Sequence, residues 1–366
     1  MLDIMGDFVG VCEQRHSPSC GGCGLGHAPS SLKMLQEMDA VIIYDGYSSP
    51  IDNEFLRDDI CALNAINCPL KDKRKGYVVN HVDSCKPLLM KRLKQVNPIV
   101  IFVAGPLALR AIIQDDWTEA VDIYSRWIGQ QIPLYSLNAW IIPIHTVEQI
   151  DDFNDDMVLI ERNRSFLANA PFRRPVKDFD PKDNTLLFED SKASPEIDKM
   201  CLEEYTAFDL ETTTLKAEGD KVEIYSVAIS CGSRTISFLM TNENEEAFKR
   251  YLLSDSKKIC HNLKFEDRYI RGVYGIHMNN PYLCTMIYSH IENNQTKVAG
   301  LKFQSFVKFG VGTYGDEAKK YFKSETSNSE NLIKLCNVEQ MLMYNGIDAA
   351  CTYRLGMLYK KQMEKY

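Results

Sequence analysis

Short apolar runs that alternate with amphipathic segments constrain the fold of this chain more than any other sequence feature. Asp39–Tyr44, Pro98–Ala104 and Trp140–Ile144 are nearly continuous apolar runs of strand length, typical of strands buried on both faces. Cys85–Val96 and Pro106–Ile113 instead carry apolar residues at helical spacing. Buried strands that alternate with helices predict an α/β sandwich with a mostly parallel sheet in the N-terminal part.

The C-terminal part repeats this logic with a different order of elements. We predict three strands that form a β-meander, then a helix, a fourth short strand and a mostly helical remainder from Lys264. The predicted ranges are Tyr205–Asp209, Glu223–Ser230, Arg234–Met240, Glu243–Leu253 and Lys258–Cys260. The chain is therefore of the α/β class in both parts.

An acidic, proline-containing stretch separates the two parts. Residues 151–200 carry a net charge of -4, which is half of the total of -8, whereas residues 201–366 are neutral. Prolines among Asp, Asn and Ser are typical of turns and irregular chain. We predict one domain over residues 1–160, a connection over 161–200 and a second domain over 201–366. No apolar run reaches 18 residues, so we expect no membrane helix and no membrane partner.

Three short motifs in the C-terminal part carry acidic side chains at regular spacing. In Phe208-Asp209-Leu210-Glu211-Thr212 the two acids lie two apart, so both project from the same face of a strand. Two later motifs each place two side chains four residues apart, and so on one helical face: Asn262 with Glu266, and Tyr344 with Asp348. Each motif alone also fits solvated acids, but three in this order on strand, helix and helix indicate a common site.

A carboxylate cluster beside a phenol suits one kind of chemistry. Hard divalent cations such as Mg²⁺ or Mn²⁺ prefer oxygen ligands. Two such ions about 4 Å apart can activate a water and stabilise the leaving oxygen of an in-line phosphoryl displacement. The motifs therefore predict a two-ion site.

These motifs also carry a family resemblance. Phe208–Thr212, His261-Asn262-Leu263-Lys264-Phe265-Glu266 and Tyr344–Thr352 resemble the three motifs of the 3′→5′ proofreading exonuclease domain of family A DNA polymerases. The resemblance covers residues 201–366 and implies a ribonuclease-H-like fold that acts on a single-stranded DNA 3′ end. It implies further that the metal ligands are Asp209, Glu211, Glu266 and Asp348, that Asp209 bridges the ions, that Tyr344 orients the attacking water and that Asn262 contacts DNA.

The second motif departs from the family pattern at one position. The family usually has Asp where this sequence has Glu266, and Asp267 follows directly. Consecutive helical residues point about 100° apart, so only one of the two can face the site. We prefer Glu266 as the fourth carboxylate and keep Asp267 as the alternative.

Cysteines concentrate at the other end of the chain. Cys20 and Cys23 form a C-x2-C pair in a glycine-rich turn, and Cys68 and Cys85 follow. Four thiolates can bind zinc or an iron–sulfur cluster, whereas Cys61, Cys68 and Cys85 could also be small buried apolar residues. The pattern by itself leaves these alternatives open.

Residues 12–150 resemble the family 4 uracil-DNA glycosylases. The resemblance implies a 4Fe–4S cluster on Cys20, Cys23, Cys68 and Cys85, with zinc as the alternative. Asn64 and His145 fall at the positions of the family's site motifs, and Asp45 stands in for its water-activating acid. The loop around Asp45 differs from the family's, and Thr146 rather than Pro follows the histidine. We predict a degenerate glycosylase-like module for DNA binding or docking, with active uracil excision as the alternative.

A basic stretch supports DNA contact by this module. Residues 71–94 hold eight Lys or Arg against two Asp, inside a segment that is otherwise acidic. The residues that we expect to contact phosphates are Lys71, Lys73, Arg74 and Lys75. A solvated loop and helix face is the alternative interpretation.

Taken together, the two resemblances indicate the N-terminal half of certain bacteriophage family A polymerases, without the polymerase domain. We therefore expect a separate phage polypeptide or part of a longer one, a proofreading exonuclease that works beside a DNA polymerase in the bacterial host cytoplasm. The alternatives are a replisome adaptor with little nuclease activity, or an active uracil-DNA glycosylase fused to a nuclease.

Overall fold

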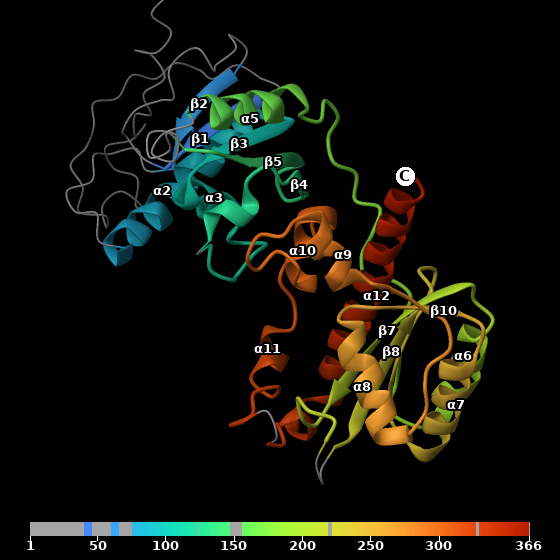
Figure 1. The fold of residues 1–366 in the computed structure, drawn as a ribbon. Helices are drawn as coiled ribbons and strands as arrows, with labels where there is room; N and C mark the ends of the chain where they lie inside the picture. Colours follow the sequence, from blue (N-terminus) through green and yellow to red (C-terminus); the bar gives the residue numbers. More distant parts are fainter. Residues whose placement is uncertain are drawn as a thin grey trace, which may run out of the picture. The chain divides into compact units, whose positions relative to one another are not determined.

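The computed structural model describes residues 40–45, 60–65, 75–121, 123–146, 156–218, 222–326 and 329–365. These form two compact units (Figure 1). The first comprises described residues up to Lys177 together with Phe306–Gly310, and the second comprises Asp178–Ser305 and the chain from Val311. Among the described residues, no helix has the length and apolar character required to cross a membrane. The domain limits at 160 and 201 remain predictions.

The first unit is built on a five-stranded sheet with the order β2-β1-β3-β5-β4. Its strands are β1 (Ala40–Tyr44), β2 (Ile60–Asn64), β3 (Val100–Ala104), β4 (Ile132–Leu134) and β5 (Ala139–Ile144). All pairs are parallel except β4 with β5. The helical elements are α2 (Lys75–Val96), α3 (Pro106–Ile113), η2 (Tyr124–Trp127) and α5 (Asp156–Ala168).

The core of this unit follows the two-residue period of the strands. Ile42, Phe102 and Ile142 are buried on one face, where Phe166 and Leu167 of α5 pack against them. The predicted α/β class, the strands and the mostly parallel sheet are confirmed. The short edge strand β4 was not predicted, because three residues with a central proline give no periodic signal.

The second unit contains a six-stranded sheet with the order β11-β10-β7-β8-β9-β6. Its strands are β6 (Thr185–Phe188), β7 (Tyr205–Thr212), β8 (Ile224–Ser230), β9 (Thr235–Leu239), β10 (Lys257–Cys260) and β11 (Pro281–Cys284). The antiparallel meander β7–β8–β9 is extended on the β7 side by parallel strands β10 and β11. A meander continued by parallel strands beside its first strand is the ribonuclease-H-like arrangement that the motifs predicted.

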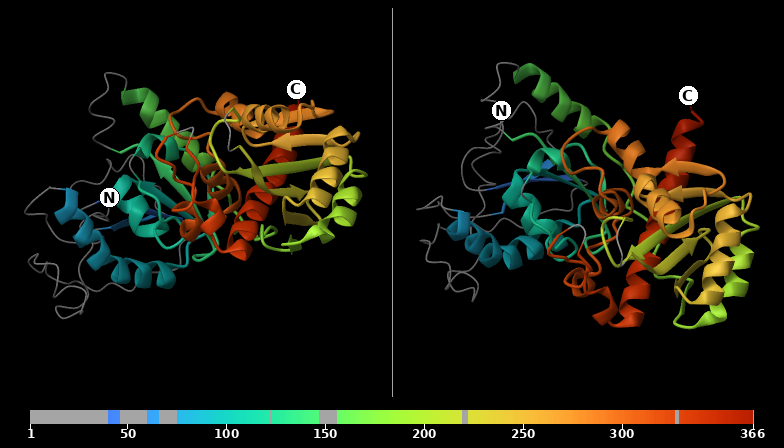
Figure 2. Two further views of the ribbon diagram at one scale, coloured as in Figure 1. Left: turned by 90° about the horizontal axis from the view of Figure 1, so that it is seen from below. Right: turned by 60° about the horizontal axis from the view of Figure 1, so that its bottom comes forward.

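Helices cover both faces of this sheet (Figure 2). α12 (Val338–Met363) lies on one face, and α6 (Ser194–Met200), α7 (Asn242–Leu253) and α8 (Leu263–Tyr274) lie on the other. The further helical elements in this part of the chain are α9 (Thr285–Glu292), α10 (Leu301–Phe309), α11 (Asp316–Lys319), η3 (Ser191–Ala193) and η4 (Ile333–Leu335). Phe208 and Leu210 of β7 are buried in the core that α6, α7 and α8 share. The alternate residues of β7 therefore face the long helix α12.

Several elements differ from the sequence prediction. The stretch expected to be an irregular connection carries most of α5, all of α6 and the strand β6, which pairs with β9. The C-terminal remainder expected to be mostly helical includes β11. Both strands have only four residues, too few for periodicity to separate a strand from a loop.

Close packing of α12 on the sheet yields a first stability prediction. A Cβ on Gly356 would lie 2.7 Å from Cγ2 of Ile259, a fully buried side chain of β10. Overpacking costs about 1–3 kcal/mol, more than the roughly 1 kcal/mol that Ala gains over Gly inside a helix. We expect Gly356→Ala to lower the free energy of unfolding in urea, and the exposed control Lys361→Ala to leave it unchanged. A Gly356→Ala protein that is at least as stable as wild type would contradict this packing.

Candidate metal centre

Three predicted carboxylates meet where β7 crosses α12. Asp209 and Glu211 occupy the β7 positions that alternate with buried Phe208 and Leu210, so they point to the α12 side of the sheet. Asp348 lies on the buried face of α12. One carboxylate oxygen from each of these three acids lies within 4.8 Å of the others. Side chains from two elements more than 130 residues apart are thus brought together as the motif spacing predicted.

The three carboxylates are held in a setting that disfavours their charged forms. Burial, followed by the charge of Asp348, raises the pKa of Asp209 well above its usual range. Burial and the charges of Asp209 and Asp348 do the same for the pKa of Glu211. Burial also raises the pKa of Asp348. Neighbouring like charges of this kind are relieved by a divalent cation, and carboxylate oxygens are the ligands that Mg²⁺ and Mn²⁺ prefer, so the residues fit such ions.

The side-chain amide of Asn345 on α12 holds the carboxylate of Asp209 in place. The side-chain nitrogen of Asn345 donates to Oδ2 of Asp209 at 2.8 Å and to its backbone oxygen at 3.3 Å. Asn345 is itself fully buried, and its side-chain oxygen accepts a hydrogen bond from Ser226 at 3.3 Å. This bridge fixes Asp209 relative to the helix that carries Asp348.

The structure distinguishes the two acids of the second motif. Glu266, in the first turn of α8, is only 3% exposed, and the charges of Asp209 and Glu211 add to burial in raising its pKa. Within the described residues, its Oε2 atom is buried without a hydrogen-bond partner. Asp267 instead forms a salt bridge of 2.8 Å with Arg271 one turn later. Burial and the missing partner of Glu266 favour it over Asp267, but Glu266 lies outside the group of three close carboxylates, and its role as a ligand remains a prediction.

Two tyrosines meet at Asp348. Tyr344 lies one turn before Asp348 on α12, as predicted, and its hydroxyl lowers the pKa of this carboxyl against the effect of burial. The hydroxyl of Tyr314, just before α11, donates to Oδ1 of Asp348. Tyr314 was missed by the sequence analysis because the segment that carries it has no recognisable motif.

A lysine also missed by the sequence analysis lies over both rings. The Nζ atom of Lys302 on α10 is 4.8 Å from the ring centroid of Tyr344 and 4.9 Å from that of Tyr314. Its charge favours the ionised forms of two carboxylates, because it lowers the pKa values of Glu211 and Asp348 against the effect of burial.

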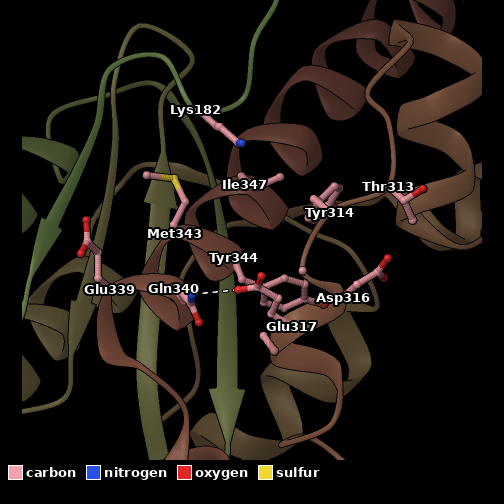
Figure 3. A pocket seen from close by; sticks show the side chains of 12 residues that line it. Lys182, Thr313, Tyr314, Asp316, Glu317, Glu339, Gln340, Met343, Tyr344 and Ile347 are labelled. Atoms are coloured by element: carbon pink, nitrogen blue, oxygen red, sulfur yellow. Dashed lines mark hydrogen bonds between the residues drawn. The ribbon is translucent and has the colours of Figure 1, made fainter. Parts of the chain in front are cut away.

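A pocket of about 510 Å³ adjoins this arrangement (Figure 3). Tyr314 and Tyr344 form part of its wall, and the amide of Gln340 donates to Glu317 across it at 2.8 Å. The remaining lining residues are Lys182, Thr313, Gly315, Asp316, Ala318, Glu339, Met343 and Ile347. Because Tyr314 lines the pocket and also bonds Asp348, the pocket lies beside the carboxylate group.

Asn262 begins α8 in a left-handed conformation, with φ 73° and ψ 50°. Its side chain makes no capping hydrogen bond to that helix. The predicted contact of Asn262 with DNA remains a prediction.

The neighbouring residue His261 gives a pH prediction. Its Nδ1 atom is 2.9 Å from the Thr285 hydroxyl, and burial lowers the pKa of His261 from 6.5 to about 4. The unfolded chain thus binds more protons between pH 4 and 6.5, so this histidine makes stability rise with pH over that window.

We test this with His261→Gln. On acidification from pH 7 to 4, the free energy of unfolding of the wild type, measured in urea, should fall by up to about 3 kcal/mol more than that of the variant. A difference in stability that does not change with pH would contradict the prediction.

In the first unit, the predicted glycosylase-like residues follow parallel strands at one edge of the sheet. Asp45 follows β1, Asn64 ends β2 and His145 follows β5. Oδ1 of Asp45 accepts a hydrogen bond of 2.7 Å from the backbone nitrogen of Ala108 in α3. The Asn163 side chain bonds both backbone polar groups of His145, at 2.9 and 3.1 Å. The position of these three residues at one edge of the sheet agrees with the order of the motifs. The carboxylate of Asp45, however, already accepts a hydrogen bond from the backbone of α3.

Most of the other residues predicted for this unit lie outside the described part of the chain. They are Cys20, Cys23, Cys68, Lys71, Lys73 and Arg74. Lys75 begins α2, and its side chain is not among those described. Cys85 is a buried thiol of α2. The cluster and the DNA contacts therefore remain predictions.

Comparison with known protein families finds a match in the C-terminal part of the chain. Residues 187–364 match the family model described as 3′-5′ exonuclease. The C-terminal half of the chain is therefore a 3′-5′ exonuclease domain with a ribonuclease-H-like fold. A search of curated proteins finds no match to the sequence.

Solved structures that resemble the chain include several nucleases. NrnC of Brucella melitensis with bound Mg²⁺ is 18% identical, with a TM-score of 0.37 over 50% of this chain and 83% of that one. Escherichia coli RNase D, titled an exoribonuclease involved in structured RNA processing, is 15% identical, with a TM-score of 0.37 over 49% of this chain and 44% of that one. The catalytic core of RRP6 from Trypanosoma brucei is 14% identical, with a TM-score of 0.36 over 47% and 45%.

Proposed function

We propose that this chain is a divalent-metal-dependent 3′→5′ exodeoxyribonuclease that edits single-stranded DNA 3′ ends beside a phage replication polymerase. The observation that carries the proposal is the group of Asp209, Glu211 and Asp348, whose ligand oxygens lie within 4.8 Å of one another inside the exonuclease domain. Choice of DNA over RNA, and the polymerase partner, are supported by the resemblance of the three motifs to proofreading domains.

The site residues have distinct parts in this proposal. Asp209, Glu211 and Asp348 would hold two Mg²⁺ or Mn²⁺ ions, with Asp209 between them and Glu266 as the fourth carboxylate. Such ions would supply Lewis acidity for attack by water and departure of the leaving oxygen. Tyr344, one turn before Asp348 on α12, would orient that water through its hydroxyl. Burial of the cluster keeps bulk water from screening these charges.

The N-terminal unit has a supporting part. We propose that it is a glycosylase-like module that binds DNA or docks a partner, with a 4Fe–4S cluster, or alternatively zinc, on Cys20, Cys23, Cys68 and Cys85. Support comes from the cysteine pattern and from the placement of Asp45, Asn64 and His145 at one sheet edge. Capping of α3 by Asp45 favours binding over uracil excision.

Substrate choice is tested with matched oligonucleotides. A 5′-labelled DNA strand and an RNA strand of the same sequence are each incubated with the full chain and Mn²⁺. We expect a ladder of 3′-shortened DNA and slower shortening of RNA. Faster shortening of RNA would replace the DNA-editing role by an exoribonuclease role, whereas cleavage of neither strand would contradict the nuclease proposal.

A further inference from the structure

The ring of Tyr344 is held by an unusually close backbone contact. Gly315 has a φ of +73°, and a Cβ built on it would lie 2.1 Å from Cδ2 and 2.5 Å from Cε2 of Tyr344. Only glycine combines a left-handed conformation with an approach this close. Any larger residue at position 315 must displace the ring. Phe322 packs against the same ring, with centroids 5.2 Å apart.

Lys302 holds Tyr344 and its neighbour together. Its ammonium lies within 5 Å of both tyrosine ring centroids and also donates to the backbone oxygen of Tyr314 at 3.2 Å. A cation over an aromatic face is attracted to the ring, and more strongly when both are shielded from water. The hydroxyl of Tyr314 donates to Asp348, and Tyr344 lies one turn before Asp348 on α12. Lys302 therefore joins α10, the segment before α11, and the catalytic helix α12.

We propose that Lys302 and Gly315 are positioning residues of the nuclease reaction, which fix the Tyr344 ring so that its hydroxyl stays beside Asp348. The inference rests on the proposed function of Tyr344 as the residue that orients the attacking water. Reacting groups must be held in near-attack geometry, and a misplacement of about 1 Å can cost on the order of 100-fold in rate. A ring restrained only by its own side-chain torsions would not meet that requirement.

Electrostatics separates this role from a merely structural one. A lysine beside a carboxylate cluster repels any further cation that binds there. At a pH where the carboxylates are ionised, its removal should therefore leave metal binding unchanged or slightly tighter, even while turnover falls. General damage to the site would instead weaken metal binding and turnover together.

The test measures kcat, KM and the half-saturating Mn²⁺ concentration on a labelled single strand. Lys302→Met and Gly315→Ala should each lower kcat by on the order of 100-fold without a higher KM or Mn²⁺ requirement. Lys302→Arg should stay within a few-fold of wild type, because a guanidinium keeps a cation over the rings.

A matched control uses another lysine that lies over a tyrosine. Lys360 is 5.2 Å from the ring of Tyr205, near the far end of α12. Twelve residues separate it from Asp348, which is about 18 Å along a helix. Lys360→Met should behave as wild type.

A double-mutant cycle decides whether Lys302 acts through Tyr344. In a Tyr344→Phe background the hydroxyl is gone, so Lys302→Met should lower kcat by less than about threefold further. The inference is overturned if Lys302→Met costs the same factor in both backgrounds, weakens Mn²⁺ binding, or leaves kcat unchanged in an active wild type. An inactive wild-type chain would overturn the proposed function itself.

Discussion

Replacing Asp209 with Asn should lower the rate of nuclease cleavage by at least about 1,000-fold, because the variant loses the carboxylate expected to lie between both ions. The amide oxygen can still accept the hydrogen bond from Asn345, so the local geometry should be retained. Without metal the variant should be more stable than wild type, since one of three crowded charges is removed.

A matched control shows that this loss is specific to the cluster. Asp198 is a carboxylate of the same domain that pairs with Arg250 on the surface at 2.8 Å. Asp198→Asn should retain activity within a few-fold. Cleavage that survives in Asp209→Asn would contradict the assignment of the carboxylate group, and a lower metal-free melting temperature would contradict its crowded charges.

Divalent metal should stabilise the protein, and the effect should grow with pH. Burial raises the pKa values of Asp209, Glu211 and Asp348, and neighbouring charges raise those of Asp209 and Glu211 further, so protons compete with the ion for these oxygens. Without metal, these raised pKa values favour the folded state at low pH, and that contribution is lost as pH rises through them. An ion at about 100 times its dissociation constant adds roughly 2.7 kcal/mol.

The measurement is the change in melting temperature on adding Mn²⁺ between pH 5.5 and 8. We expect a small rise at the acid end, a larger one at pH 8, and complete loss of cleavage with a chelator. The double variant Asp209→Asn with Asp348→Asn serves as the control and should show no metal-dependent rise. A stabilisation that is the same in wild type and control, or that shrinks as pH rises, would contradict a metal site at these residues.

The sequence predicted those parts of the site that local periodicity fixes. The two-residue period of a strand places Asp209 and Glu211 on one face, and the helical turn places Tyr344 beside Asp348. Buried strands alternating with helices also predicted the α/β class of both units. β7 and α12 come together through tertiary packing, which local periodicity does not predict. The three motifs taken together nevertheless indicated a common site.

Other parts of the site depend on contacts that no local pattern encodes. Lys302 and Tyr314 belong to segments without a motif, and they reach Asp348 only because α10 and the residues before α11 fold over α12. The salt bridge of Asp267 with Arg271 favours Glu266 as the fourth carboxylate, and no local pattern in the sequence predicts that salt bridge. Most of the cysteines predicted to bind a cluster lie outside the described residues. The prediction of that cluster therefore rests on the sequence pattern.

The most direct test of metal-dependent exonuclease action is an end-labelled cleavage assay with the full chain. A single DNA strand labelled at its 5′ end is incubated with Mn²⁺. In parallel, the same strand is tested with its 3′-terminal linkage blocked by a phosphorothioate. For metal-dependent exonuclease action we expect a ladder of products shortened one nucleotide at a time from the 3′ end, slowed by the blocked end and absent in Asp209→Asn. An intact strand, or an equal ladder from Asp209→Asn, would contradict it.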